Sequence, residues 1–238
     1  MRQCAAVSEN WKNIRARMAE AALRSGRQPS DVTLLAATKT VDPEVINHAI
    51  GLGLTHMGEN RVQELCAKYD RLHREGVDIH LIGHLQTNKV RQIADKVSTI
   101  QSVDSLRLAQ EISRACQKQG RRMDVLLEVN IGGEAQKSGI APEALEELYD
   151  QTMALPMLRV RGLMTIPPVC DTETQVRKYF SQMHQLFLDI QAKKSDNVYI
   201  DCLSMGMSQD YEAAILEGAT MVRVGSSLFG ARSYPAAK

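Results

Sequence analysis

A lysine at the end of an apolar segment is the residue with the clearest chemical potential in this sequence. Lys39 closes the run Thr33-Leu34-Leu35-Ala36-Ala37-Thr38, which has the composition of a buried strand. Burying a lysine is costly because desolvation disfavours its charged form. An amine whose pKa is lowered in this way can form a Schiff base with an aldehyde. The local sequence alone slightly favours the plainer interpretation, in which Lys39 simply reaches solvent at the strand end.

Two segments rich in glycine and serine are candidates for binding an anion. Ser204-Met205-Gly206-Met207-Ser208 and Val224-Gly225-Ser226-Ser227 each lie where a predicted strand ends. Glycine lets backbone amides approach an anion, and serine adds a hydroxyl donor. One such segment usually indicates only a turn. A phosphate site after the last two strands recurs in (β/α)8 barrels, so the pair favours phosphate binding.

An arginine stands beside the second of these segments. Arg223 precedes Gly225 by two residues, and the period of a strand places both on one face. Because an arginine stays charged, a buried Arg223 needs an acceptor. The sequence leaves two acceptors open, a bound ligand or a carboxylate in a structural ion pair.

Other familiar motifs are not supported. Gly51-Leu52-Gly53 precedes a predicted strand, whereas a dinucleotide-binding glycine motif follows one, and no P-loop is present. His80 and His84 lie four residues apart on a probable strand without further clustered ligands, so we expect no metal site.

The elements that must position these residues alternate between short apolar runs and helical stretches. Predicted strands cover 33–39, 55–59, 79–84, 99–103, 124–131, 160–166, 199–204 and 221–225. Predicted helices cover 43–52, 60–75, 89–97, 105–119, 141–154, 172–193 and 209–217, after an amphipathic helix over 3–26. Several strands lack alternation, as expected of parallel strands buried on both faces. The pattern predicts an α/β fold with a single (β/α)8 TIM barrel over 1–238 and an added N-terminal helix over 1–26; an open doubly wound sheet is the alternative.

Composition excludes several classes of function. Lys+Arg and Asp+Glu number 29 and 28, and aromatic residues are 4%, which argues against nucleic-acid or anionic-membrane binding. The five scattered cysteines contain no CxxC and suggest the reducing cytoplasm. The first residues lack an apolar signal core, and no run of 18 apolar residues occurs, so neither export nor membrane insertion is expected.

Taken together, the motifs resemble those of the pyridoxal phosphate homeostasis family, the YggS/PROSC-type proteins that bind pyridoxal 5′-phosphate (PLP). The resemblance covers about residues 5–234. It rests on Thr38-Lys39-Thr40, Gly58-Glu59-Asn60, the segment from His80 to Gln86 with Asn88-Lys89, Lys137-Ser138-Gly139, the segment from Arg161 to Pro167, the segment from Ser204 to Ser208 with Asp210, Val222-Arg223-Val224-Gly225 and Phe229-Gly230-Ala231-Arg232.

The resemblance implies a barrel similar to the N-terminal domain of alanine racemase. It implies that Lys39 forms the Schiff base, that Arg223 faces the pyridine nitrogen and that Asn60 lines the site of the ring. It assigns Ser204, Ser208, Gly225 and Ser226 to the phosphate, and Met207 and His84 to the pocket wall. Ser226 stands where many relatives carry threonine, which keeps the hydroxyl. Lys137 is a candidate for secondary PLP binding, although a solvated loop lysine is the plainer interpretation.

The predicted function is therefore a non-catalytic PLP binder that buffers, stores or delivers the cofactor. An arginine beside the ring favours the unprotonated nitrogen and a weaker electron sink. The chain ends just after the last barrel element, and we expect no second domain to supply the opposite-face base of a racemase. A racemase-like enzyme is the alternative, with Tyr211, His84 or a second subunit as base. We expect a monomer, with PLP-dependent apo-enzymes as recipients. A regulatory interaction module, with the basic N-terminal helix as its surface, is also compatible with carriage.

Overall fold

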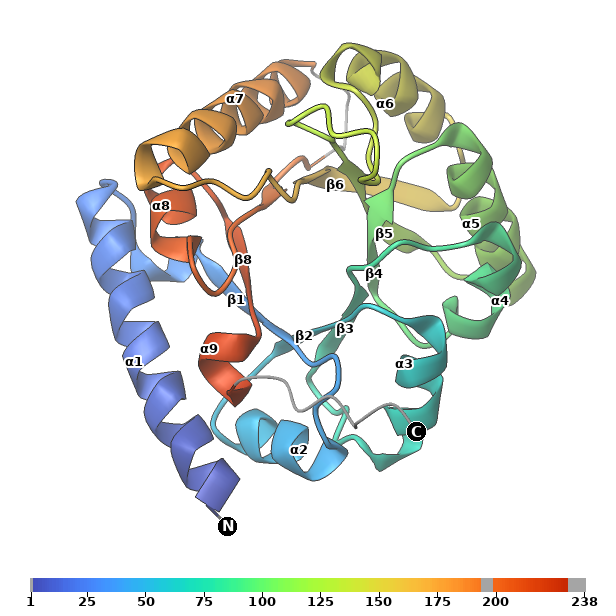
Figure 1. The fold of residues 1–238 in the computed structure, drawn as a ribbon. Helices are drawn as coiled ribbons and strands as arrows, with labels where there is room; N and C mark the ends of the chain where they lie inside the picture. Colours follow the sequence, from blue (N-terminus) through green and yellow to red (C-terminus); the bar gives the residue numbers. More distant parts are fainter. Residues whose placement is uncertain (1, 194–198, 231–238) are drawn as a thin grey trace.

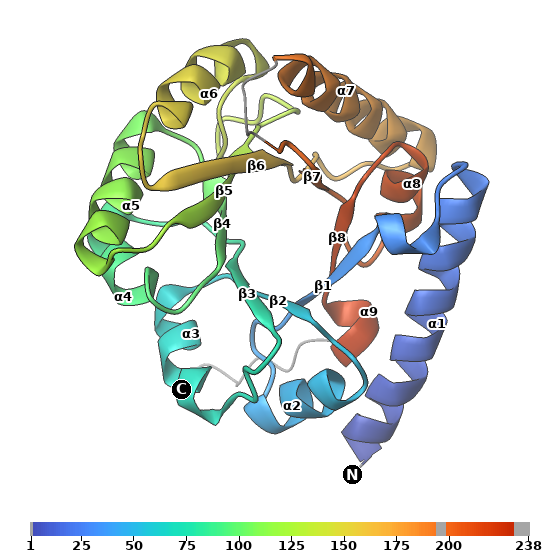
Figure 2. The ribbon, with the colours of Figure 1, turned by 180° about the vertical axis from the view of Figure 1, so that it is seen from behind.

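Eight parallel strands form a closed barrel in the computed structural model, which describes residues 2–193 and 199–230 (Figures 1 and 2). Each strand pairs with the next along the chain, and the eighth pairs with the first. The strands are β1 (Thr33–Ala37), β2 (His56–Glu59), β3 (Asp78–Leu81), β4 (Thr99–Val103), β5 (Met123–Glu128), β6 (Leu158–Met164), β7 (Cys202–Ser204) and β8 (Met221–Val224). This closure confirms the predicted TIM barrel and excludes the open doubly wound sheet.

Helices surround the barrel on the outside, as both views in Figures 1 and 2 show. They are α1 (Arg2–Arg24), α2 (Pro43–Gly51), α3 (Val62–Lys68), α4 (Val90–Ile93), α5 (Leu106–Gln119), α6 (Leu145–Met153), α7 (Glu173–Ala192), α8 (Tyr211–Leu216) and α9 (Ser226–Phe229). Short 3-10 turns occupy Pro29–Asp31, Tyr69–Arg71, Thr87–Lys89 and Pro142–Ala144.

Local sequence signals set several of these boundaries. The side chain of Asp42 accepts a hydrogen bond from the Glu44 amide, and Pro43 occupies the first turn of α2, as the sequence predicts. Ser105 caps α5, and Gly120 ends it in a left-handed conformation. The one-turn helix α9 was not predicted, because its sequence indicates only a turn.

The added helix α1 lies along α8, α9 and α2 on the outside of the barrel (Figure 1). Its apolar face is buried through Val7, Ile14 and Met18. The amide of Asn10 donates to the carbonyl of Leu228 at 3.0 Å, which ties α1 to α9. The N-terminal helix therefore packs beside the helices that follow β7 and β8.

Among the described residues, a small apolar cluster in the barrel interior is formed by Leu35, Ala37, Ile82 and Met221. Gly58 on β2 makes room for it, because a Cβ atom there would lie 2.5 Å from Leu35 and 3.0 Å from Ile82. Most of the other buried apolar side chains pack between the strands and the surrounding helices.

No described helix is both long enough and apolar enough to cross a membrane.

Candidate functional site

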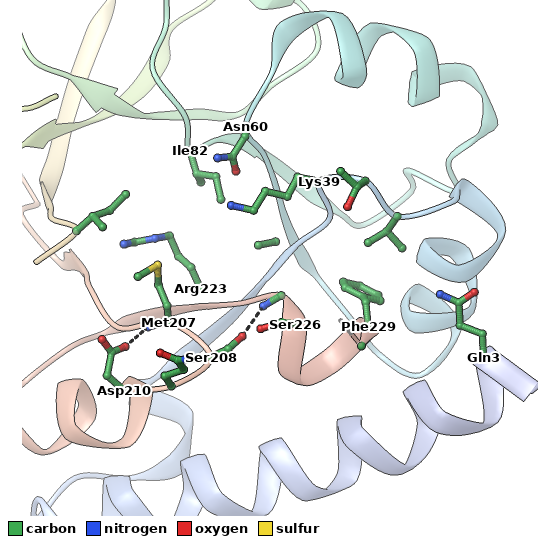
Figure 3. A pocket seen from close by; sticks show the side chains of 17 residues that line it. Gln3, Lys39, Asn60, Ile82, Met207, Ser208, Asp210, Arg223, Ser226 and Phe229 are labelled. Carbon is green, nitrogen blue, oxygen red and sulfur yellow. Dashed lines mark hydrogen bonds between the residues drawn. The ribbon is translucent and has the colours of Figure 1, made fainter. Parts of the chain in front are cut away.

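A cavity of about 310 Å³ opens at the C-terminal ends of the strands. Its wall includes Lys39 and Asn60, which follow β1 and β2, and Arg223 on β8. Met207 and Ser208 enter from the loop after β7, and Gly225 and Ser226 from the turn after β8. Figure 3 shows the Lys39 side chain extending into the space bordered by Asn60 and Arg223, with Ser208 and Ser226 on the side of α9. Seven of the nine residues predicted for the site and its pocket wall thus line one cavity of the size that holds a small ligand.

Lys39 lies in a turn two residues beyond the end of β1, although the sequence predicted a strand through residue 39. The strand ends at Ala37, and Thr40, directly after Lys39, has a φ of +62°. This left-handed conformation is unfavourable for a β-branched residue, and such strain concentrates at functional sites. The Thr40 amide donates to Oε1 of Glu64 at 2.5 Å, which holds the strained turn. Lys39 is half-buried, as its position at the cavity wall requires.

A buried ionic network supports this turn from the side of α3. The Lys68 amine donates to the carbonyl of Thr38 at 2.8 Å, to Oε1 of Glu59 at 2.9 Å and to Glu64. Burial raises the pKa of Glu59, and the attraction of Lys68 opposes that rise. Lys68 therefore fixes the backbone directly before Lys39, and through Glu64 it fixes the backbone directly after it. Sequence reasoning missed this network because Lys68 and Glu64 stand on α3, whereas the backbone that they hold belongs to the turn after β1.

Arg223 is held by oxygen atoms of the barrel wall. Its guanidinium donates to the Ser204 carbonyl at 2.8 Å, to the Ser204 hydroxyl at 2.7 Å and to the Thr165 carbonyl at 2.8 Å. Within the described residues, no carboxylate lies within 4.0 Å of the guanidinium, so a structural ion pair is not the explanation for Arg223. Burial lowers the pKa of Arg223 to about 10, which still leaves it cationic at neutral pH. The cavity thus has a fixed positive charge in its wall.

The loops after β7 and β8 are joined through Ser208. Its hydroxyl accepts from the amide of Gly225 at 3.1 Å and from the amide of Ser227 at 3.2 Å. The Ser227 hydroxyl in turn donates to the Ser208 carbonyl at 3.1 Å. Asp210, which the sequence did not single out as a site residue, lines the cavity and fixes the first loop by accepting from the Met207 amide at 2.6 Å. Burial raises the pKa of Asp210.

Three other predicted residues lie away from the cavity wall. Ser204 is fully buried behind Arg223, and its hydroxyl donates to Gln101, so it contacts the arginine instead of lining the cavity. His84 faces Asp104 with its imidazole Nδ1 3.8 Å from the carboxylate. Lys137 pairs with Glu134 and donates to the Pro167 carbonyl at 2.9 Å.

The donors in the cavity fit PLP. An aldehyde requires an amine, which Lys39 supplies, and a phosphate dianion requires hydroxyl and amide donors. Within the described part of the chain, the Ser226 hydroxyl lines the cavity without a hydrogen-bond partner and is available as such a donor. Asn60 Oδ1 is likewise buried without a partner among the described residues. No group of three or more His, Cys, Asp or Glu residues within residues 2–193 and 199–230 is arranged to hold a metal ion.

The fold and the site define an alanine racemase-type barrel domain. The family model for the N-terminal domain of alanine racemase matches residues 3–233. An unknown protein from Bifidobacterium adolescentis has a crystal structure similar to this one, at 37% identity and a TM-score of 0.90, covering 95% of this chain and 96% of that chain.

Relatives that match nearly the whole chain identify the family within this class of barrel domains. A pyridoxal phosphate homeostasis protein from Aquifex aeolicus is 46% identical over 226 residues, which cover 95% of this chain and 98% of that relative. The structure of PipY from Synechococcus elongatus PCC7942 with PLP bound is similar at 36% identity and a TM-score of 0.78, covering 90% of this chain and all of that one. The chain belongs to the pyridoxal phosphate homeostasis protein family.

Proposed function

We propose that this protein binds PLP in the cavity at the C-terminal end of the barrel and serves intracellular PLP homeostasis. The observation that carries the proposal is the convergence of Lys39, Arg223, Ser208, Gly225 and Ser226 on one cavity. In this assignment the Lys39 amine joins the PLP aldehyde as a Schiff base, with loss of water. Gly225, Ser226 and Ser208 hold the phosphate end, Arg223 faces the ring nitrogen, and Asn60 and Met207 border the ring.

Arg223 also makes the site better suited to holding PLP than to turnover. A cationic arginine does not protonate the ring nitrogen, and an unprotonated ring is a weaker electron sink. Of the described residues that line the cavity, the titratable ones are Lys39, Asp210 and Arg223. Tyr211 and His84, the two residues of this chain predicted as bases for an enzyme, lie outside this wall. We therefore propose buffering, storage or delivery of PLP, with PLP-requiring apo-enzymes as recipients. The free cysteines favour a reducing cytoplasm.

Absorbance and peptide mapping test the attachment point. The purified protein with PLP should show a yellow band that borohydride reduces, and mass mapping should find the adduct on the peptide containing Lys39. Lys39→Ala should abolish the band, while some noncovalent PLP is retained through the phosphate donors. Lys137→Ala is the matched control and should leave the band unchanged. A reducible adduct of normal intensity in Lys39→Ala would contradict the assignment.

Solvent exchange tests the absence of turnover. Incubation of the PLP-loaded protein with alanine in deuterated water should give little exchange of the α-proton and no racemisation. Robust exchange that disappears in Lys39→Ala would show that the protein is an enzyme.

A further inference from the structure

A chain of buried polar side chains crosses the barrel interior behind Arg223. The Arg223 guanidinium donates to the Ser204 hydroxyl at 2.7 Å, and this hydroxyl donates to Oε1 of Gln101 at 2.7 Å. The Nε2 amide of Gln101 lies 2.8 Å from Nδ1 of His80. These residues stand on β8, β7, β4 and β3, and each is at most 5% exposed. The chain therefore joins the cofactor cavity to residues on the far side of the barrel.

The direction of every hydrogen bond in this chain follows from Arg223. An arginine only donates, so the Ser204 oxygen accepts from it and its proton goes to the Gln101 carbonyl oxygen. That orientation turns the Gln101 amide nitrogen toward His80, whose Nδ1 must accept. His80 is then the neutral tautomer with its proton on Nε2. Burial lowers the pKa of His80 to about 3, in agreement with a neutral ring.

The far end of the chain meets a second cavity at the N-terminal end of the barrel. His80 lines this cavity of about 300 Å³ together with Thr33, Ser98 and Asp201. The His80 Nε2 proton has no partner within the described residues, so it is left to the solvent or solutes of this cavity. This series of hydrogen-bonded side chains thus runs from one cavity to the other, and each side chain in it is hydrogen-bonded to the next.

Such a chain is unusual in a barrel interior, which branched apolar side chains normally fill. Buried polar groups cost desolvation free energy, and a fully satisfied network compensates by fixing one arrangement. We propose that Ser204, Gln101 and His80 are positioning residues that hold the Arg223 guanidinium in a single orientation toward the cofactor cavity. This inference rests on the proposed function of Arg223 opposite the PLP ring. In this role, Ser204 acts on the ring of PLP through Arg223 and does not contact the phosphate.

The order of donors can be tested in the cofactor-free protein. Nitrogen-15 NMR of the imidazoles should show His80 as the neutral Nε2–H tautomer between pH 5 and pH 8. Gln101→Glu replaces the amide nitrogen by a second acceptor, so His80 should change to a ring that carries a proton on Nδ1. Retention of the Nε2–H tautomer in Gln101→Glu, or an Nδ1–H tautomer in the unmodified protein, would contradict the proposed order of donors and acceptors from Arg223 to His80.

The positioning role is tested in the PLP-loaded protein. Ser204→Ala and Gln101→Leu should shift the absorption maximum of the bound cofactor and accelerate PLP release roughly tenfold, as the loss of a hydrogen bond to a charged group implies. His80→Asn can still offer an acceptor to Gln101, so it should restore the unmodified spectrum that His80→Leu loses. Ile100→Val is the matched control, because it removes one methylene from the apolar face of the same strand as Gln101.

If Ser204, Gln101 and His80 contribute only to the stability of the fold, the result is different. Ser204→Ala and Gln101→Leu would then lower the melting temperature, as Ile100→Val does, but leave the spectrum and the release rate of bound PLP unchanged. That outcome would overturn the positioning role. Failure of the unmodified protein to bind PLP would contradict the proposed function separately, since the tautomer of His80 is measured without PLP.

Discussion

At the scale of single residues, buried hydroxyl groups differ in whether they have a hydrogen-bond partner. Thr165 is fully buried, and its hydroxyl donates to the Val129 carbonyl at 2.7 Å. Thr152 on α6 is equally buried, but its hydroxyl has no partner among the described residues. A buried polar group contributes to stability only when it is paired, so these two threonines should respond differently to the same substitution.

Replacement of each threonine by valine tests this difference. Thr165→Val leaves the Val129 carbonyl unpaired and should lower the free energy of unfolding by about 1–2 kcal/mol. Thr152→Val removes an unpaired hydroxyl and should leave the stability unchanged or raise it by up to about 1 kcal/mol. Urea denaturation followed by circular dichroism measures both. Equal losses in the two variants would show that the Thr152 hydroxyl has an important partner.

At the scale of elements, the close approach of neighbouring backbones restricts which residue types a strand position can accept. Gly162 on β6 has a φ of +153°, and a Cβ atom there would lie 1.8 Å from the carbonyl oxygen of Cys202 on β7. The exposed Gly51 ends α2, and a Cβ atom there would meet nothing within 4 Å. The first glycine is required by strand packing, whereas the second only adds conformational freedom to the unfolded chain.

Two alanine substitutions follow from this contrast. Gly162→Ala should lower the free energy of unfolding by more than about 2 kcal/mol, because both the backbone conformation and the spacing between β6 and β7 must change. Gly51→Ala should raise it by about 0.5–1 kcal/mol. Thermal unfolding of both variants is the measurement. A stable Gly162→Ala variant would show that β6 and β7 separate more easily than their packing indicates.

At the scale of the whole molecule, buried carboxyl groups make stability depend on pH. Glu128 at the end of β5 is 4% exposed, and its Oε1 accepts from the Ser138 hydroxyl at 2.7 Å. Its Oε2 has no partner among the described residues. Burial raises the pKa of Glu128 above the ordinary value of 4.5. Between these two pKa values the folded state binds more protons than the unfolded state, so stability falls as the pH rises from about 4.5.

Glu128→Gln should remove this contribution. The free energy of unfolding of the variant should decline less steeply than that of the unmodified protein as the pH rises above 4.5, and the variant should be relatively more stable at neutral pH. Unfolding curves at half-unit steps from pH 4.5 to pH 8 provide the comparison. A steeper decline in the variant would mean that Glu128 is stabilised as a carboxylate and that the sign of the shift is wrong.

The sequence by itself determined the α/β class, the order of the strands and helices and most of the cavity wall, whereas closure of the sheet into a barrel was seen only in the structure. Alternating apolar runs and helical stretches specify eight strand–helix units, and short parallel strands can satisfy their backbone hydrogen bonds together only in a sheet covered by helices. Residues at the C-terminal ends of such strands must meet at one end of the barrel. For this reason the sequence alone places Lys39, Asn60, Gly225 and Ser226 together.

Tertiary structure alone decided which atoms support these residues. The contact of Lys68 with the Thr38 carbonyl, and the hydrogen bond from Ser204 to Gln101, join elements that are far apart in sequence. No local pattern marks such partners, because the distance between them depends on how the barrel closes and which side chains turn inward. The position of Ser204 shows the difference. Its place at the end of a predicted strand suggested phosphate binding, whereas barrel closure brings its hydroxyl to Arg223 and Gln101.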